Sequence, residues 1–242
     1  MYKQWRNTMQ FFVDHGIDNA FYWGCYVLAF TVTFVFNAKY AKKYNISAFK
    51  GLAFSFASYA IIYIWAYILG WVANGFSWGH HNAIRVFAWM PLVLLVVGKL
   101  FKIKWNIACD YIAPSTCLVY GIARLGCNFT GCCYGYPACW GIYSWQAGHR
   151  CFPVQLCQSI ASIAVFFIIL HLAKTRDYKP TNKLYPIMLI MYGAARFLLE
   201  FFMDNKKLFM HVSEIALWGL LCVIIGFVWL YGSKKEEMIN SK

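Results

Sequence analysis

Long apolar stretches separated by short polar segments make up most of this chain. An α-helix rises about 1.5 Å per residue, so roughly 20 apolar residues cross the hydrocarbon core of a bilayer. Windows of that length predict an all-α integral membrane protein with seven transmembrane helices. The predicted spans lie near residues 20–37, 52–73, 86–101, 107–126, 153–173, 184–203 and 211–231.

The third and fourth spans are less regular than the others. The third is short and contains Pro91, and the fourth contains Asp110, Pro114 and Arg124. Proline inside a helix removes one backbone hydrogen bond and bends the chain. We therefore expect a kink near Pro114, beyond which the helix carries Arg124 to one end of the span.

The composition agrees with a membrane protein. Of 242 residues, 61% are hydrophobic and only 13% are charged, which is more apolar surface than one soluble core of this size uses. We find no internal repeat, linker or low-complexity tract, so residues 1–242 are expected to form a single transmembrane domain. Within it, residues 127–152 are expected to form an irregular, cysteine-rich extracytoplasmic loop.

The net charge of +13 could indicate nucleic-acid binding. The basic residues are, however, spread between the spans and form no soluble basic module. They lie in alternate connections, where cytoplasmic loops are expected to be positive. This asymmetry predicts a cytoplasmic C-terminus and, with seven spans, an external N-terminus. The residues concerned are Lys39, Lys42, Lys43, Lys50, Lys99, Lys102, Lys104, Lys174, Arg176, Lys179, Lys183, Lys234, Lys235 and Lys242.

The sixth predicted span contains ionisable side chains. At about 100° per residue, Tyr192, Arg196 and Glu200 fall within about 80° of one helix face. Two interpretations remain open, an internal ion pair that helps helices pack and a functional site, which is the default hypothesis for charge inside a membrane. Arg124 adds a second intramembrane arginine. Two arginines from different helices would form a clamp for a lipid phosphate.

Six of the ten cysteines lie between Cys127 and Cys157. Disulfides are one interpretation. A metal site fits less well because the spacing contains no CxxC pair, and we predict neither a metal nor a cofactor. The third interpretation is a reactive thiol, since Cys132 and Cys133 follow Arg124 closely and positive charge favours a thiolate.

Four stretches resemble the prolipoprotein diacylglyceryl transferase family. Asp110-Tyr111-Ile112-Ala113-Pro114 followed by Arg124-Leu125-Gly126 resembles the approach to the family signature, and Gly131 and Gly135 stand where that signature has glycines. The segment Phe152-Pro153-Val154-Gln155-Leu156 resembles the His-Pro-x-Gln-Leu entry into the next span. Tyr192 to Phe201 is similar to the YGxxRFxxEF segment. The matched segments extend over residues 110–204.

The resemblance implies a bacterial cytoplasmic membrane enzyme that moves diacylglycerol from phosphatidylglycerol to a lipoprotein precursor's cysteine thiol at the outer leaflet. It implies phosphate binding by Arg124 and Arg196, a headgroup hydrogen bond from Tyr192, and a role for Glu200 in holding Arg196 or taking a proton. Gln155 and Gly131 would belong to the substrate site. The implied partners are the phospholipid, the lipoprotein precursor and the membrane, and nucleic acid is not among them.

The chain also departs from the family pattern. An ungapped comparison puts Cys127 and Thr130 at the signature's asparagines and Cys132 at its glutamate. The histidine-glycine-glycine motif expected near the third span is absent from the segment RVFAWMPLVLL, and Met203 stands where a further arginine is usual. The chain therefore resembles a divergent, cysteine-rich relative.

The missing histidine motif leaves the proton acceptor open. His80, His81 or His149 would have to serve, or another group would. The alternatives are a different phospholipid-modifying enzyme that uses Cys132 or Cys133 covalently, a lipid-binding protein without catalysis, and a thiol redox protein of the membrane.

Overall fold

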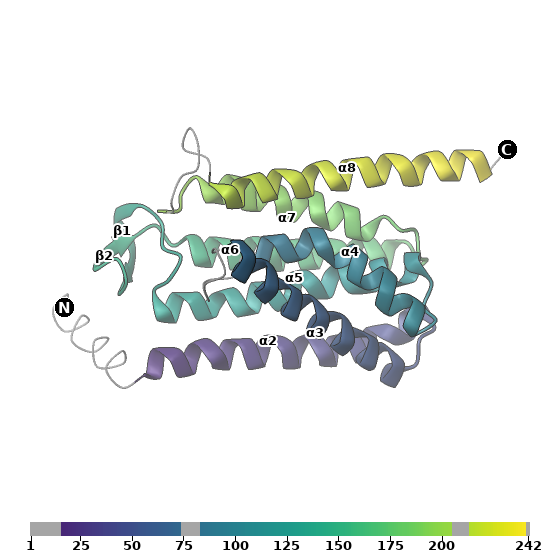
Figure 1. Cartoon of the computed structure of the whole chain (residues 1–242), viewed down its shortest axis with the longest axis horizontal. Helices are drawn as coiled ribbons and strands as arrows, with labels where there is room; N and C mark the ends of the chain where they lie inside the picture. Colours follow the sequence, from purple (N-terminus) through teal and green to yellow (C-terminus); the bar gives the residue numbers. More distant parts are fainter. Residues whose placement is uncertain (1–15, 74–82, 205–212, 241–242) are drawn as a thin grey trace.

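The computed structural model describes residues 16–73, 83–204 and 213–240. These residues form a bundle of seven α-helices, which confirms the predicted number (Figure 1). A 3₁₀ turn, Lys42–Tyr44, follows the first helix, and a two-stranded sheet lies between the fourth and fifth. The helices are α2 (Ile17–Ala41), α3 (Ala48–Ala73), α4 (Ala83–Leu100), α5 (Trp105–Thr130), α6 (Val154–Thr175), α7 (Leu184–Glu200) and α8 (Glu214–Asn240).

Hydropathy explains most of these elements. Four segments are long and apolar enough to cross a membrane, namely Asn19–Tyr44, Ala48–Val72, Val154–Thr175 and Glu214–Ser233. The helices that contain them expose large apolar side chains on their outer faces, as expected for contact with lipid. Helix α4 has a shorter apolar stretch, and α5 and α7 carry the ionisable residues of the spans.

Helix α5 runs through Pro114 without ending. A proline at this position cannot donate to the carbonyl four residues earlier, which is that of Asp110. The Tyr44 hydroxyl donates to this carbonyl instead, at 3.4 Å. The buried polar group is therefore satisfied from a neighbouring element, as a helix inside a membrane requires.

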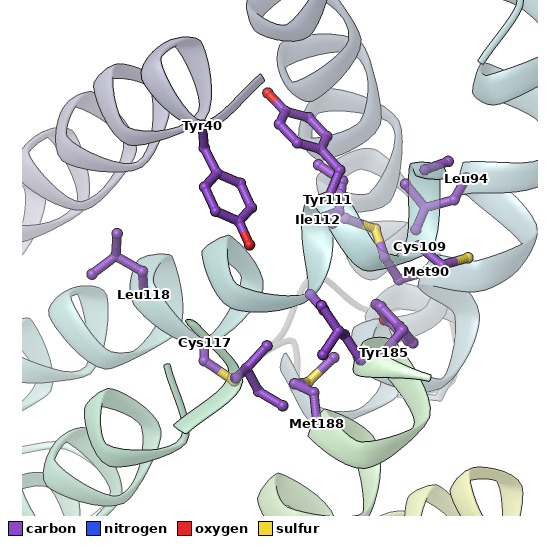
Figure 2. Close-up of a cluster of buried hydrophobic side chains, with 14 of the residues drawn as sticks. Tyr40, Met90, Leu94, Cys109, Tyr111, Ile112, Cys117, Leu118, Tyr185 and Met188 are labelled. Carbon is purple, nitrogen blue, oxygen red and sulfur yellow. The ribbon is translucent and has the colours of Figure 1, made fainter. Parts of the chain in front are cut away.

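The core lies around the first half of α5. Figure 2 shows Tyr111 and Ile112 of α5 beside Met90 of α4 and Met188 of α7, and all four are completely buried. Close packing of such side chains leaves few voids, so α5 is held on several sides at once. The central position of α5 fixes the direction in which its far end, with Arg124, projects.

A buried carboxylate joins α5 to the start of α7. Asp110 accepts hydrogen bonds from the backbone N–H groups of Thr181 (2.7 Å), Asn182 (2.9 Å) and Leu184 (2.9 Å). These N–H groups belong to the turn before α7 and to its first residue, where helical partners are lacking. Asp110 therefore caps α7 from a different helix.

Helices α7 and α8 approach each other closely at glycine. A Cβ atom added to Gly193 would lie 2.7 Å from the Gly219 carbonyl oxygen, and one added to Gly219 would lie 3.0 Å from the Gly193 carbonyl oxygen. Small residues at such crossings let two helix backbones pack directly. This packing sets the position of α7, which carries Arg196.

The segment 127–152 differs from the expected irregular loop. Helix α5 continues through Thr130, and Gly131 ends it with a φ of 66°. Strands β1 (Pro137–Ser144) and β2 (His149–Cys151) then pair in antiparallel register. Irregular backbone is confined mainly to residues 131–136. The closely spaced glycines predicted a series of turns. The two strands depend on pairing between residues that are distant in the sequence, which a local pattern does not reveal.

The two ends of the bundle differ. The β1–β2 hairpin, the start of α2 and the ends of α5 and α7 lie at one end, and α8 finishes at the other (Figure 1). The connections after α2, α4 and α6 also lie at this second end, and together with the helix ends that flank them they contain most of the lysines counted above. We call the first end the hairpin end.

Candidate functional site

A cavity of about 620 Å³ lies inside the bundle, towards the hairpin end. Its walls come from α2, α3, α4 and α5, from the turn after α5, and from residues near the end of α7 and the start of α8. Arg124 and Arg196 both line it. The volume is in the range of small-molecule sites.

The Arg196 guanidinium has a carboxylate partner on its own helix. Its Nη1 lies 3.0 Å from Oε2 of Glu200, and the two side chains are 5% and 1% exposed. The Ser213 hydroxyl donates to Glu200 Oε1 at 2.9 Å. The ion pair between Arg196 and Glu200, which their spacing of one helical turn predicted, is therefore present in the structure. This pair compensates the charge of Arg196 inside the bundle.

Arg124 has different surroundings. Its Nε donates to the Gln158 side-chain oxygen on α6, and its Nη1 lies 3.5 Å from Cys127 Sγ and 3.6 Å from Cys133 Sγ. Within residues 16–73, 83–204 and 213–240, Arg124 has no carboxylate at bonding distance, in contrast to Arg196. Sulfur and amide groups hold this guanidinium.

Two side chains connect the arginines. Gln158 Nε2 lies 3.4 Å from the Met203 sulfur, and Arg196 Nη1 lies 3.3 Å from the same sulfur. Gln158 also accepts from Arg124. Arg124 on α5 and Arg196 on α7 are therefore linked through Gln158 and Met203, which contact each other beside the cavity.

Three thiols gather beside Arg124. Cys127, Cys132 and Cys133 all line the cavity, and Thr130 Oγ1 lies 3.3 Å from Cys132 Sγ. Hydrogen bonds with Cys127 and Cys132, together with the Arg124 guanidinium, lower the pKa of the Cys133 thiol well below its usual value. Hydrogen bonds with Cys127 and Cys133 raise the pKa of Cys132.

The ten cysteines all fall within the described residues, and each is a free thiol. No disulfide therefore links the cysteine-rich segment in this structure. Among the described side chains, no group of three or more His, Cys, Asp or Glu is arranged to hold a metal ion. The reactive-thiol interpretation is the one that the local geometry favours.

The sequence was compared with known proteins. The profile of the family described as prolipoprotein diacylglyceryl transferase matches residues 20–232, which is most of the chain. The chain belongs to this family. Relatives called phosphatidylglycerol–prolipoprotein diacylglyceryl transferase include one from Cupriavidus metallidurans, 33% identical over 58% of this chain and 56% of its own.

Two further relatives have similar names. The transferase called number 2 of Clostridium perfringens is 27% identical over 55% of both chains. That of Geobacter sulfurreducens is 32% identical over 45% of this chain and 42% of its own. The matched region thus spans about half the length of these relatives.

The remaining predicted site residues support the cavity wall. Tyr192 lies behind the wall, because its ring stacks on Phe87 at 4.0 Å and meets Tyr120 edge-on at 5.2 Å, and these two residues line the cavity. Gln155 Nε2 donates to the Cys132 carbonyl at 2.6 Å. The Gly131 carbonyl accepts from Ser144 Oγ at 2.7 Å. Gln155 and Gly131 therefore position the backbone that carries the two adjacent thiols.

The departures from the family pattern fall at this same wall. Met203, at the position where the family usually has an arginine, places a thioether between Gln158 and Arg196. Cys132, at the position of the signature's glutamate, lines the cavity. A positive and a negative group are thus both replaced by sulfur, which leaves the formal charge of the pair unchanged.

The histidines considered as proton acceptors do not line the cavity where they can be placed. His149 lies on β2, beside Cys139 and Arg150 in a shallow surface groove. His80 and His81 lie outside the described residues.

Sequence reasoning missed two kinds of residue at the site, one that contacts the cavity wall from behind and one that lines it. Gln158 is a buried polar residue in an apolar span, one turn after Gln155, and this spacing was the available signal. The other kind is tyrosine, whose sequence positions are those of ordinary interfacial or core aromatic residues. The lining tyrosines are Tyr22, Tyr26, Tyr59, Tyr63, Tyr120 and Tyr134.

Proposed function

We propose that this protein transfers the diacylglyceryl group of phosphatidylglycerol to the cysteine thiol of a lipoprotein precursor. One observation carries the proposal: two guanidiniums from different helices line one cavity, and apolar side chains, phenols and thiols make up much of the rest of its wall. Membership of the family and the names of its relatives support the same reaction.

The reaction is a displacement at a glycerol carbon. The acceptor loses its proton, the thiolate forms a carbon–sulfur bond, and the bond between that carbon and the phosphate oxygen breaks. Glycerol phosphate leaves with the electron pair and one additional negative charge. Fixed positive charge stabilises this developing charge most strongly in a site that excludes water. We assign Arg124 and Arg196 to the phosphate.

The other predicted residues act through these two cations. Glu200 holds Arg196 in the orientation seen here and is a positioning residue. Tyr192 acts on the headgroup through Tyr120, which it contacts and which lines the cavity. Gln155 and Gly131 fix the turn that carries Cys132 and Cys133.

We place the site at the outer leaflet of the bacterial cytoplasmic membrane. The cavity lies towards the hairpin end, and the lysine-rich connections lie at the opposite end. Positive connections are cytoplasmic in membrane proteins of this kind. The hairpin with its cysteines is then extracytoplasmic, the N-terminus is outside and the C-terminus is inside.

The test uses the purified full chain in detergent with phosphatidylglycerol labelled in its headgroup and a peptide that contains the acceptor cysteine. We expect the peptide to gain the mass of one diacylglyceryl group and an equal amount of labelled glycerol phosphate to be released. Arg124→Gln and Arg196→Gln should each lower turnover about 100-fold, as loss of one charge-stabilising group does. Arg176→Gln, in the turn after α6, is the matched control.

Full turnover in either cavity variant would overturn the assignment of the arginines. Release of glycerol phosphate without a modified peptide would favour the second candidate, a phospholipid-modifying enzyme that forms a covalent adduct on Cys132 or Cys133. The contact of Cys133 with Arg124 favours that candidate. Its signature is a mass increase on the peptide that contains residues 131–136.

A further inference from the structure

We propose that the sulfur of Cys133 accepts the proton of the incoming thiol, an inference that rests on the proposed transferase function. Cys133 lines the cavity and lies 3.6 Å from Arg124 Nη1. The reaction needs a proton acceptor within reach of the acceptor thiol, and the family's histidine motif is missing from this chain.

The turn holds Cys133 in an uncommon backbone conformation. Its φ is 56°, in the left-handed region that residues other than glycine seldom adopt. Such conformations cost free energy and concentrate at functional sites. Here the conformation follows the left-handed Gly131, and Gln155 holds the carbonyl of the intervening Cys132. The sulfur of Cys133 is thus directed at Arg124 by the backbone itself.

The neighbouring thiols of Cys127 and Cys132 are less suitable as the proton acceptor. The Cys132 sulfur is in contact with the Thr130 hydroxyl, and its hydrogen bonds with Cys127 and Cys133 raise its pKa. Cys127 belongs to the last helical turn of α5. Hydrogen bonds with both thiols and the nearby guanidinium lower the pKa of Cys133, so its anionic form is favoured over that of Cys132.

The carboxylates at the cavity are engaged or exposed. Glu200 binds Arg196 and Ser213. Glu214 accepts from the Trp218 indole N–H at 3.2 Å. Asp204 lines the cavity but is exposed to solvent. Asp204 is therefore the rival that the experiment has to exclude.

Lipid binding would strengthen Cys133 as a base. Before lipid binds, the Arg124 guanidinium favours the anionic form of Cys133. A phosphate bound at Arg124 brings negative charge beside the sulfur, and a nearby like charge disfavours the anionic form of a thiol. The proton of the incoming thiol then moves to Cys133, the new thiolate attacks carbon, and Cys133 later releases the proton to glycerol phosphate or water.

The experiment compares Cys133→Ser and Cys133→Asp with the wild-type chain in the peptide assay. We expect Cys133→Ser to lower kcat about 100-fold, the usual contribution of a proton acceptor, with little change in KM for phosphatidylglycerol. Cys133→Asp, which can accept a proton, should recover part of the loss. Cys139→Ser, on the exposed face of β1, is the matched control.

A second acceptor separates proton transfer from a structural role. A selenocysteine peptide is already ionised at neutral pH and needs no base. The deficit of Cys133→Ser relative to wild type should therefore shrink at least tenfold with this peptide. An equal deficit with both peptides would show that Cys133 only supports the fold and would overturn the inference.

Three other results have distinct meanings. Normal kcat in Cys133→Ser together with a large loss in Asp204→Asn would assign the proton to Asp204 and overturn the inference, while the proposed function stands. A lipid adduct on Cys133 in the wild-type chain would make it a nucleophile and would also overturn the inference. No thioether product from the wild-type chain would instead refute the proposed function.

Alkylation tests the thiolate without turnover. Iodoacetamide at neutral pH should modify Cys133 in the folded wild-type chain, and Arg124→Gln should slow this reaction about tenfold because the counter-charge is lost. Phosphatidylglycerol vesicles should also slow it. An alkylation rate of Cys133 that is unchanged in Arg124→Gln would count against the assignment.

Discussion

At the scale of the residue, the two arginines differ in the group that balances their charge. Arg196 has a permanent carboxylate partner in Glu200, whereas Arg124 contacts an amide and two sulfurs. An anionic ligand that binds Arg124 does not have to compete with a carboxylate for the guanidinium, as it would at Arg196. Arg124 is therefore the residue at which we expect phosphate to bind first.

The Arg196–Glu200 pair gives the first prediction. Glu200→Gln leaves a buried guanidinium uncompensated, which costs about 3–5 kcal/mol when one partner of a buried pair is removed. Thermal unfolding in detergent should show a lower midpoint than for the wild type. Phosphatidylglycerol should restore more of the midpoint in this variant than in the wild type, since its phosphate replaces the lost charge. An unchanged midpoint would show that the pair is not needed for stability.

The turn after α5 gives the second prediction. A Cβ on Gly131 would lie 2.8 Å from the Trp145 backbone nitrogen, whereas one on Gly148 would meet nothing within 4 Å. Both glycines have positive φ, so alanine costs about 1 kcal/mol of backbone strain at either site. Gly131→Ala should in addition displace the thiols and reduce peptide modification several-fold. Equal activity of Gly131→Ala and Gly148→Ala would contradict the role given to this turn.

At the scale of the element, hydropathy predicted the seven helices because each contains a run of mainly apolar residues, whether that run faces outward or, as in α5, packs inside the bundle. Helical spacing alone also predicted the contact between Arg196 and Glu200. The link from Arg124 through Gln158 and Met203 to Arg196 could not be predicted, because it joins residues of α5, α6 and the segment after α7. Such contacts depend on helix packing, which a local pattern does not contain.

The contact between α7 and α8 gives the third prediction. Gly193→Ala would place a Cβ 2.7 Å from the Gly219 carbonyl oxygen and should force the helices apart. We expect a lower unfolding midpoint in detergent and weaker activity, because α7 carries Arg196. Gly24→Ala in α2 is the control, since a Cβ there meets nothing within 4 Å. Similar midpoints for the two variants would exclude close packing at this crossing.

At the scale of the whole molecule, the bundle has one end with the hairpin and one end with most of the positive charge. The seven helices bring the start of α2 and the end of α8 to opposite ends (Figure 1). This arrangement agrees with the orientation expected from the distribution of lysine and arginine. The orientation itself is a proposal that labelling of intact cells can decide.

The fourth prediction concerns this orientation. Cys139 is exposed on β1, so a maleimide that cannot cross membranes should label it from outside intact spheroplasts. A chain with serine at the other nine cysteines isolates this signal. In a cysteine-free chain, Lys179→Cys should be labelled only after the membrane is permeabilised. The reverse pattern would invert the proposed topology.

The cap that Asp110 provides for α7 has a mechanical consequence. It ties the two arginine-bearing helices together at the end remote from their arginines, through three backbone hydrogen bonds to one carboxylate. Near the arginines, the same helices are bridged by a glutamine and a thioether, which are weaker and more yielding groups. Helices α5 and α7 are therefore fixed to each other at the Asp110 end. We expect the distance between Arg124 and Arg196, at the other end, to adjust to the size of the bound headgroup.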